Sequence, residues 1–315
     1  MSRWMCVWIC AMVWTQPAAA IHLWNIELPT MARESRAIVY GEVTGTKSFY
    51  DSGRGEVLTE VEMSLMEALK EDTEVKAAAR FVIAGGVHED VEWAGPGLPK
   101  LSRGDVAVVF LEKLDGRYWP YGLPLGIFNQ TVTSAGKAVL KRDLTDAHVV
   151  HMDDTGAEVP VKVNYYGIDG FKQKIREYLG AAPKAEPGLN ERYAQSDAVA
   201  AGRVTGVRVS LTSDSLVETQ VDLKPHQILK GDTRAIWIIR VEGGELPDVK
   251  YESYDMPAFV QNGEYLVLLK TTPAGLSPIG SAGAVPGRRR SDGRFEILTP
   301  DGRILLLDQV DFGAR

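Results

Sequence analysis

Two copies of one spaced pattern, at residues 85–111 and 243–269, constrain the fold of this chain more than any other feature. Each copy begins with a double glycine, has a proline 14 positions after the first glycine, and ends in a short apolar run. Nearly all residues between these positions differ from one copy to the other. A repeat of this kind, with fixed spacing and free sequence, predicts an internal duplication of a domain-sized unit.

The duplication extends upstream of the double glycines. Residues 34–45 match residues 195–206 at an offset of 161, and residues 57–72 match residues 217–232 at an offset of 160. Within the opening pattern, Asn262 is interpreted as a one-residue insertion that precedes the second apolar run. Such small changes of offset indicate loops of different length between fixed elements.

The matched blocks have the periodicity of β-strands. Residues 57–63 and 217–223 alternate apolar and polar side chains, which indicates half-buried antiparallel strands. Gly41 and Gly202 stand inside the preceding strands, where a glycine indicates a sharp bend or bulge. Closing a bent sheet removes its exposed edges. The sequence therefore predicts a mainly β chain of two tandem OB-like, five-stranded Greek-key barrels, with two small antiparallel β-sandwiches as the alternative.

An amphipathic helix is predicted between the two copies. Ile168, Phe171 and Ile175 fall on one helical face, and Gly180 is placed to end the helix. The linker that follows is rich in alanine and proline. The expected organisation is a first barrel domain at 21–160, the helix and linker at 161–188, and a second barrel domain at 189–315.

The first 20 residues have the order of a secretory signal peptide, with Arg3, an apolar run at 4–14 and small residues up to Ala20. Cleavage near Ala20 is expected, which places the protein in the periplasm or outside the cell. The apolar run is shorter than the roughly 20 residues that cross a bilayer, so no transmembrane segment is expected in the mature chain. Cys6 and Cys10 are the only cysteines. Because both lie in this segment, stability is expected to come from hydrophobic cores.

The charge pattern argues against nucleic acid as a partner. The formal net charge is −7 at pH 7, and an acidic chain gains nothing from a phosphate backbone. The only dense basic run is Arg288 to Arg290, beside Gly287 and Asp292. It is interpreted as a solvated loop and not as a phosphate-binding patch.

Sequence signals for catalysis are weak. His148, His151 and Asp153 are the candidate metal ligands, but positions three apart on a strand face opposite sides, so only a turn or helix would bring both histidines together. Patterns such as Gly-x-Ser-x-Gly, His-Glu-x-x-His and the phosphate loop do not occur in the sequence. No cofactor is expected. A metal-dependent hydrolase that uses these three residues is kept as an alternative function.

Aromatic residues in expected loops are the candidates for binding a partner. In small barrels the loop between the first two strands is a common recognition element, and here it contains Phe49, Tyr50 and Arg54. Exposed aromatic and arginine side chains are frequent anchors at interfaces. The loops before the two prolines supply a second candidate set: Trp93, Tyr251 and Tyr254. The alternative for both sets is that the rings fill the barrel ends.

The second copy resembles the netrin-like and tissue-inhibitor-of-metalloproteinase-like domains in three stretches, at 196–204, 228–231 and 263–269. The first copy is a weaker match, with Glu71 in place of a glycine. The resemblance implies an OB-type five-stranded barrel whose usual work is binding, including protease inhibition. Tissue inhibitors ligate the zinc of their target with an amino-terminal cysteine, whereas the mature chain would begin at Ile21 without one, so only the scaffold carries over.

The function expected from the sequence is therefore an exported, non-catalytic binding module that recognises a protein partner through barrel-end loops. A secreted protease is one such partner. A structural component of the cell envelope is a further alternative to this function.

Overall fold

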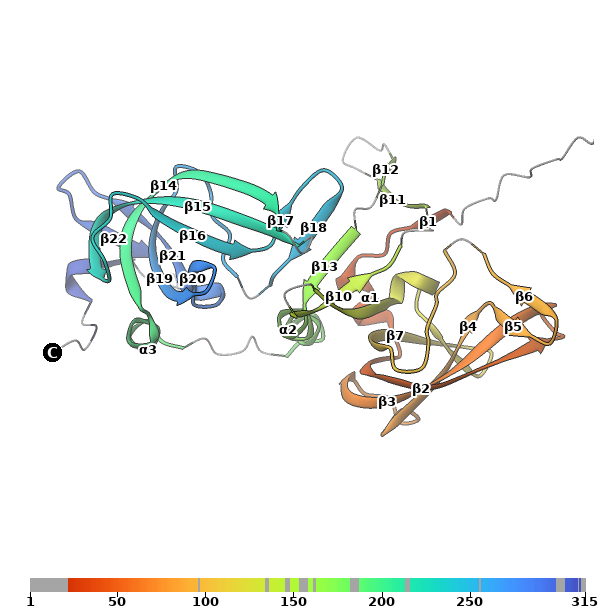
Figure 1. The fold of residues 1–315 in the computed structure, drawn as a ribbon. Helices are drawn as coiled ribbons and strands as arrows, with labels where there is room; N and C mark the ends of the chain where they lie inside the picture. The colour runs from red at the N-terminus through yellow and green to blue at the C-terminus, as the bar shows by residue number, and fades with distance from the viewer. Residues whose placement is uncertain are drawn as a thin grey trace, which may run out of the picture.

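The computed structural model describes residues 22–95, 97–133, 136–144, 148–152, 158–160, 163–181, 187–212, 216–254, 256–298, 304–310 and 312. The chain is mainly β, with two large sheets (Figure 1). This confirms the expected fold class at the level of its secondary structure. No helix in the described part of the chain is both long and apolar enough to span a membrane. The predicted signal peptide, at residues 1–20, lies outside the described residues.

The first half contributes most strands of a 10-stranded sheet in the order β17-β18-β13-β10-β9-β7-β2-β3-β4, with β8 paired to β7. Its elements are β1 (His22–Trp24), α1 (Leu28–Glu34), β2 (Ala37–Asp51), β3 (Glu56–Lys70), β4 (Ala78–Ala84), β5 (Gly86–His88), β6 (Val91–Trp93), β7 (Val106–Leu114), β8 (Arg117–Pro120), η1 (Leu123–Gly126), β9 (Ile127–Val132), β10 (Ala138–Arg142), β11 (His148–Met152), β12 (Glu158–Pro160), β13 (Val163–Gly167) and α2 (Ile168–Tyr178).

The second half forms an 8-stranded sheet and supplies two strands to the first. Its elements are α3 (Leu189–Gln195), β14 (Ala198–Leu211), β15 (Val217–Lys230), β16 (Trp237–Glu242), β17 (Gly244–Glu245), β18 (Val249–Glu252), β19 (Glu264–Thr272), β20 (Gly275–Pro278), η2 (Ser281–Gly283), β21 (Ala284–Arg289), β22 (Phe295–Leu298), β23 (Ile304–Leu306) and η3 (Leu307–Gln309). Arg288 and Arg289 lie within β21, so the expectation of a loop there is wrong for these two residues.

The two sheets share a plan of strand pairing. In the second, β14 pairs with β15, β15 with β16, β16 with β20, β20 with β19, and β19 again with β14. In the first, β2 pairs with β3 and β7, β3 with β4, and β7 with β8. Strands β4 and β8 lie next to each other. No ladder joins these two strands in the described part of the chain.

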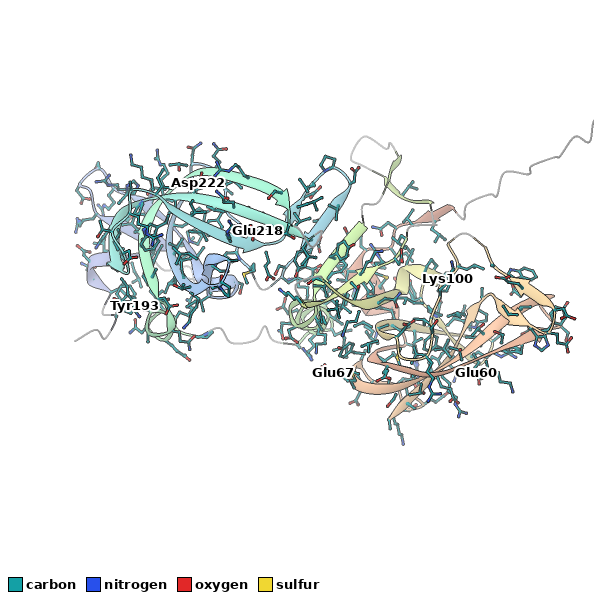
Figure 2. The ribbon with its side chains drawn as sticks, viewed as in Figure 1. Glu60, Glu67, Lys100, Tyr193, Glu218 and Asp222 are labelled. Atoms are coloured by element: carbon teal, nitrogen blue, oxygen red, sulfur yellow. The ribbon has the colours of Figure 1, made fainter. Side chains whose placement is uncertain are left out.

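The long paired strands alternate as the sequence predicts. In β15, Val217, Val221 and Leu223 are buried, whereas Glu218 and Asp222 lie on the other face and pair with arginines (Figure 2). Cross-strand pairs of opposite charge add a few tenths of a kcal/mol each at about this exposure. The alternation therefore sets which face of the sheet is turned to the core.

The mid-strand glycines lie at bulges, which confirms the sequence prediction. The register shifts between Tyr40 and Gly41 in the first sheet and immediately before Gly202 in the second. A Cβ on Gly41 would lie 2.2 Å from the carbonyl oxygen of Ser64, and one on Gly202 would lie 2.5 Å from that of Lys224. Two backbones approach too closely here for any side chain, so glycine is required.

Asn262 is not an insertion, and that part of the sequence interpretation is wrong. The backbone N–H of Gly104 donates to the carbonyl of Val43 at 2.8 Å, and that of Asn262 donates to the carbonyl of Val204 at 2.9 Å. Both residues have a left-handed backbone, with φ of 93° and 65°. Glycine and asparagine are the residues that adopt this region most readily. The offset is therefore a constant 158 from the double glycine to the end of the apolar run.

The helix predicted for 168–179 forms as α2, and it covers one side of the first sheet. Its Phe171 and Ile175 are fully buried, and Phe171 lies 4.8 Å from Phe128 between ring centroids. The opposite side of the same sheet forms a separate core around Phe81 and Val109. Two cores on one sheet mean that each long strand is buried on both faces over part of its length.

The two halves are joined by backbone pairing. Strand β13 pairs in parallel with β18, with Tyr165 opposite Tyr251 (Figure 1). A small core forms at this junction from Val139, Val217 and Tyr251. The segment 161–188, expected to hold only a helix and linker, thus also contains the strand that carries the sheet from one half to the other.

Candidate recognition surface

The hairpin of β2 and β3 presents the first candidate residues. Phe49 and Tyr50 lie within β2, opposite Leu58 and Val57, so their expected placement in a loop is wrong. The β2 strand runs to Asp51, and its ladder with β3 continues through both aromatic positions to Asp51 opposite Glu56. Phe49 packs at the edge of an outer cluster, whereas Tyr50 is 53% exposed. Tyr50 is therefore the residue of this pair that is free to contact a partner.

The outer cluster consists of Leu58, Val82 and Trp119, with Phe49 and Ala84 packed against it. It lies on the surface side of β3, β4 and β8. Trp119 is only 5% exposed, and the guanidinium of Arg54 lies 4.7 Å from its ring centroid. A cation above an aromatic face is attracted by the ring quadrupole. Arg54 therefore covers the cluster from the tip of the hairpin.

Arg117 covers the other aromatic residue of the cluster. Its guanidinium lies 5.5 Å from the ring centroid of Phe49, and its Nη1 donates to Oδ2 of Asp51 at 2.7 Å. Arg54 makes the matching bond, donating from Nη2 to Oδ2 of Asp115 at 2.9 Å. These bonds are charge-assisted and cross between the β2–β3 hairpin and the β7–β8 turn. They hold the two turns together at one end of the sheet.

Asp51 is kept ionised by its surroundings. The hydrogen bond from Arg117 lowers the pKa of Asp51 below its usual value, and the backbone N–H groups of Arg54 and Gly53 act in the same direction. All three donors bind the charged form of the carboxylate. The closed arrangement of the hairpin tip is therefore favoured above the usual carboxylate range and weakened in acid.

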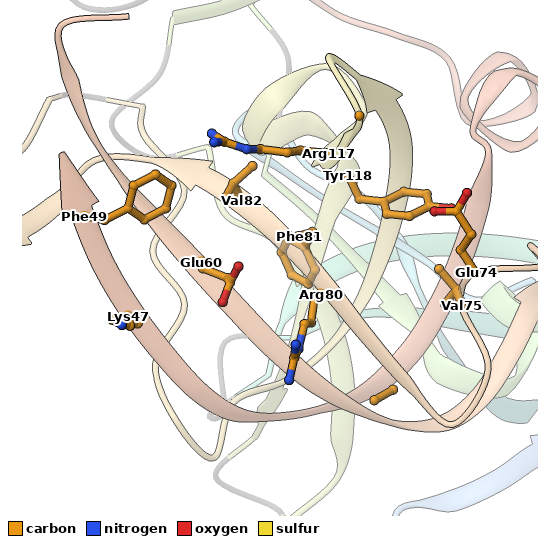
Figure 3. A pocket seen from close by; sticks show the side chains of 12 residues that line it. Lys47, Phe49, Glu60, Glu74, Val75, Arg80, Phe81, Val82, Arg117 and Tyr118 are labelled. Carbon is orange, nitrogen blue, oxygen red and sulfur yellow. The ribbon is translucent and has the colours of Figure 1, made fainter. Parts of the chain in front are cut away.

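A cavity of about 750 Å³ opens beside this cluster, between β3, β4 and β8. Figure 3 shows aromatic and charged side chains on its wall, from both the hairpin and the β7–β8 turn. The residues that set its character are Lys47, Phe49, Glu60, Arg80, Arg117 and Tyr118. Charges of both signs with aromatic rings suit a peptide better than an apolar small molecule.

Tyr118 lines the cavity and is bonded to the buried carboxylate of Asp72. Its hydroxyl donates to Oδ1 of Asp72 at 2.9 Å, and Arg36 donates to Oδ2 at 2.5 Å. The backbone N–H of Glu74 contributes most to lowering the pKa of Asp72, followed by these side chains. Burial and the bond to Asp72 raise the pKa of Tyr118 to about 12. Tyr118 therefore stays protonated and acts as a fixed donor.

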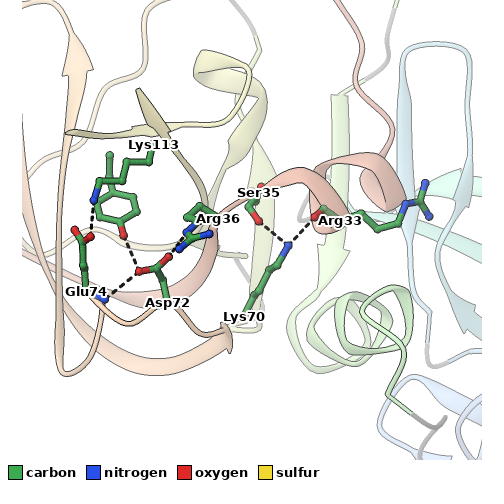
Figure 4. Close-up of polar contacts among 8 residues, drawn as sticks. Arg33, Ser35, Arg36, Lys70, Asp72, Glu74 and Lys113 are labelled. Atoms are coloured by element: carbon green, nitrogen blue, oxygen red, sulfur yellow. Dashed lines mark hydrogen bonds and ion pairs between the residues drawn. The ribbon is translucent and has the colours of Figure 1, made fainter. Parts of the chain in front are cut away.

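A lysine fastens helix α1 to the same region (Figure 4). Lys70 donates from Nζ to the carbonyl oxygens of Ala32, Arg33 and Ser35, at 3.1, 2.7 and 2.6 Å. These are carbonyls at the carboxyl end of α1, where the helix dipole favours a cation. Partial burial lowers the pKa of Lys70. This side chain has a structural role, because all its donors are used within the fold.

Strands β5 and β6 extend the surface beyond the hairpin. β5 begins at the second glycine of the double glycine, and the N–H of the first, Gly85, donates to the carbonyl of Val57 at 2.9 Å. Here Gly86 approaches the side chain of Ser48, so that β5 crosses over the β2–β3 hairpin. The exposed apolar residues of this short hairpin are Val87, at 61%, and Trp93, at 41%. Trp93 is thus available at the surface, as a binding role requires.

Tyr251 and Tyr254 are placed differently from Trp93. Tyr251 lies in β18 and is 2% exposed, within the junction core. Tyr254 stacks on Tyr166 of the first half at 6.2 Å between ring centroids, and its hydroxyl donates to Oε2 of Glu252 at 2.5 Å. Burial and Glu252 raise the pKa of Tyr254. Both rings lie at the junction of the two halves in this structure.

Two of the three candidate metal ligands lie on one strand. His148 and His151 belong to strand β11, so the backbone does not form the turn or helix that a shared site would need. Asp153 lies outside the described residues. Among the residues that are described, no group of three or more histidine, cysteine, aspartate and glutamate side chains could hold a metal ion.

Sequence reasoning missed Arg117 and Trp119, which complete the cluster around Phe49. The stretch Arg117-Tyr118-Trp119 follows Gly116 directly, and its mixture of one cation and two aromatics was the available signal. Nothing local in the sequence indicates that this turn meets the β2–β3 hairpin, because the two are more than 60 residues apart.

No protein-family model matches the chain, and no curated protein matches it.

Proposed function

We propose that the chain is an exported, non-catalytic binding module of two tandem OB-like barrels, which recognises a protein partner through the hairpins at one end of the first barrel. The barrel part of the proposal is supported by the pairings that lead from β14 through β15, β16, β20 and β19 back to β14. The shared offset of 158, with a left-handed residue at both Gly104 and Asn262, supports an origin by duplication.

One observation carries the binding proposal. Three apolar or aromatic side chains, Tyr50, Val87 and Trp93, are exposed on the β2–β3 hairpin and on the β5–β6 hairpin that contacts it. Folding alone does not require them there, since none of the three belongs to a hydrophobic core. Aromatic residues on rigid strands lose little conformational entropy when a partner covers them. They are suited to anchor a protein contact.

The arginines beside these anchors, Arg54 and Arg117, would form a polar rim around the proposed protein contact. Arg54 and Arg117 are 40% and 48% exposed at the side chain and are each held by a carboxylate. An arginine already bound to a carboxylate can donate its remaining N–H groups to a partner with little further loss of side-chain entropy. The proposed contact therefore has an aromatic centre with arginines at its edge, and an acidic or carbonyl-rich segment of a protein, as in a secreted protease, fits it.

The test compares the surface anchors with equally exposed residues elsewhere. The full chain is immobilised as the wild type, as Tyr50→Ser with Trp93→Ser, and as the control Ile236→Ser with Ile304→Ser, whose residues are 51% and 59% exposed in the second half. Secreted and envelope fractions of the native source are passed over each, and the Kd of any near-equimolar partner is then measured.

Replacement of both anchors, Tyr50 and Trp93, is expected to weaken binding at least tenfold, since each anchor contributes on the order of 1–2 kcal/mol. The control should bind as the wild type does. Equal binding by all three proteins would refute recognition through this end of the first sheet. Self-association of the pure protein without any partner would instead favour a structural role in the envelope.

A further inference from the structure

We infer that the second half carries a separate binding site for a tetrahedral oxyanion of the phosphate or sulfate class. The site is a cavity of about 570 Å³ beside β14, β15 and β21. The side chains that define it are Arg203, Lys224, His226, Glu264, Arg289 and Arg290. The inference does not depend on the proposed protein contact, which lies in the first half.

Strand register brings the cations together. Arg203 of β14 lies directly opposite Lys224 of β15 on one side and Glu264 of β19 on the other. Glu264 in turn lies opposite Gly287 of β21, two positions before Arg289. Residues from four neighbouring strands therefore reach one cavity. A site built on strands holds its side chains more closely than a site built on loops.

The cations outnumber the carboxylates that could neutralise them. Four side chains in the wall are arginine or lysine, and Glu264 is the only carboxylate there. Its Oε1 accepts from Nε of Arg203 at 3.1 Å and lies 3.4 Å from Nε2 of His226. Arg290 is bound to Glu296 at 3.0 Å and lies 3.8 Å from Asp292. One carboxylate inside the wall and two outside it thus serve two of the four cations.

The other two cations have no such neutralisation. Within the described residues, neither Lys224 nor Arg289 forms an ion pair. Lys224 also stands directly opposite Arg203, and like charges opposite one another on neighbouring strands destabilise a sheet. An anion bound between them would turn this repulsion into attraction. The lining has a formal charge of 4 − 1 = +3 with histidine neutral, in a chain of net charge −7.

The first sheet shows that the scaffold does not require these charges. Glu42 lies opposite Ser64 in the first sheet, at the positions where Arg203 lies opposite Lys224 in the second. Met66 follows Ser64 as His226 follows Lys224, two residues on. The same strand geometry is therefore built with an acidic, a polar and an apolar residue. The basic set belongs to the second half alone, as expected of a site and not of a folding element.

The chemistry of the lining selects the ligand class. Guanidinium groups match the oxygens of phosphate and sulfate with two parallel N–H donors, and an ammonium adds a point charge. Two arginines and a lysine converging from separate strands can surround a tetrahedral anion. A planar carboxylate would leave part of this donor set unused.

The experiment is calorimetric titration of the full chain, in a phosphate-free buffer of low ionic strength, with inorganic phosphate and with sulfate. Saturable binding at one site is expected. The variants Lys224→Ser, which copies the first sheet, and Arg289→Ser are each expected to weaken binding about tenfold, because each removes a charge-assisted contact. The matched control is Arg234→Ser, an exposed arginine of the same half paired only with Asp232.

Two results would overturn the inference. One is absence of saturable binding to either ion. The other is an equal loss in Arg234→Ser, which would show a general effect of net charge. A second measurement guards against misfolding: Lys224→Ser without phosphate should melt no lower than the wild type, since it removes a repulsion. Titration with O-phosphoserine identifies the source, because tighter binding than inorganic phosphate indicates a phosphate ester and equal binding a free ion.

Discussion

Arg117 donates a hydrogen bond of 2.7 Å to Asp51, and this contact joins two turns that are far apart in the sequence. The bond lowers the pKa of Asp51, so its contribution to stability is present above the unfolded pKa of this carboxyl. It is lost as the pH falls through the lower folded value. This relationship makes the hairpin end sensitive to acid.

Acid is therefore expected to loosen the β2–β3 hairpin before the rest of the sheet. The protection of the backbone amides of Gly53 and Arg54, which donate to Asp51, against hydrogen exchange, relative to the intrinsic rate at each pH, should fall when the pH falls through the folded pKa of Asp51. Asp51→Asn should show this lower protection already at neutral pH. Exchange that is the same in variant and wild type at neutral pH would contradict the prediction.

Truncation of Phe49 should lower stability, whereas truncation of Tyr50 should weaken partner binding. Phe49→Ala removes a ring packed on Leu58, Val82 and Trp119 and is expected to cost about 2 kcal/mol of unfolding free energy. Tyr50→Ala removes an exposed ring and should change stability by less than about 0.5 kcal/mol while weakening the partner. Urea unfolding of the two variants, followed by tryptophan fluorescence, decides this. Equal stability losses would show that Tyr50 is packed.

The hydroxyl of Tyr118 should lose its proton at a higher pH than an ordinary tyrosine does. Burial and Asp72 raise the pKa of Tyr118 to about 12, so the stabilisation from its protonated form is present below the unfolded value. It is lost as the pH rises through about 12. Tyr121 and Tyr254 also have a raised pKa, so an absorbance titration of tyrosinate should lose one of several late components in Tyr118→Phe. A normal titration of all tyrosines in the wild type would refute the buried bond to Asp72.

Asn262 should accept glycine but not a β-branched residue. Its φ of 65° is left-handed, and Val in this region costs roughly 1–2 kcal/mol relative to a residue that tolerates it. Asn262→Gly is expected to be close to neutral and Asn262→Val clearly destabilising in thermal unfolding. The corresponding pair at Gly104, namely Gly104→Asn and Gly104→Val, should follow the same order. A neutral Asn262→Val would show that the backbone relaxes.

Tyr251 should couple the unfolding of the two halves. It is buried at the junction where β13 pairs with β18, and Tyr251→Ala is expected to cost about 3 kcal/mol. The wild type should melt in one calorimetric transition and the variant in two, because the first half no longer stabilises the second. Tyr254→Phe keeps the ring stack on Tyr166 and serves as the control. Two transitions in the wild type would contradict the coupling.

Local patterns in the sequence predicted local structure well. Alternation in residues 217–223 predicted β15, and the mid-strand glycines predicted the bulges at Gly41 and Gly202. These features depend on neighbours a few residues away. The interpretation of Asn262 was wrong because it matched Gly263 with Gly104 by residue type. The φ values and backbone hydrogen bonds show that Asn262 is the residue equivalent to Gly104.

Contacts between distant segments could not be predicted in this way. Tyr251 looked like a loop residue because no pattern near it indicates β13 as its neighbour. The burial of Trp119 under Arg54 likewise depends on a hairpin and a turn that meet only in three dimensions. Arg289 joins a basic cavity because four strands place their residues there together. Each of these positions is set by register, which single-sequence periodicity does not fix.

The parallel pairing of β13 with β18 has a consequence for assembly. Each strand protects an edge of the other half, and a strand of this kind left uncovered is a template for a strand from another molecule. If β18 of one copy met β13 of a second, every bond of the junction would be kept and two chains would be interlocked. A domain-swapped dimer would thus need no contact that the monomer lacks, and high protein concentration during refolding is the condition that favours it.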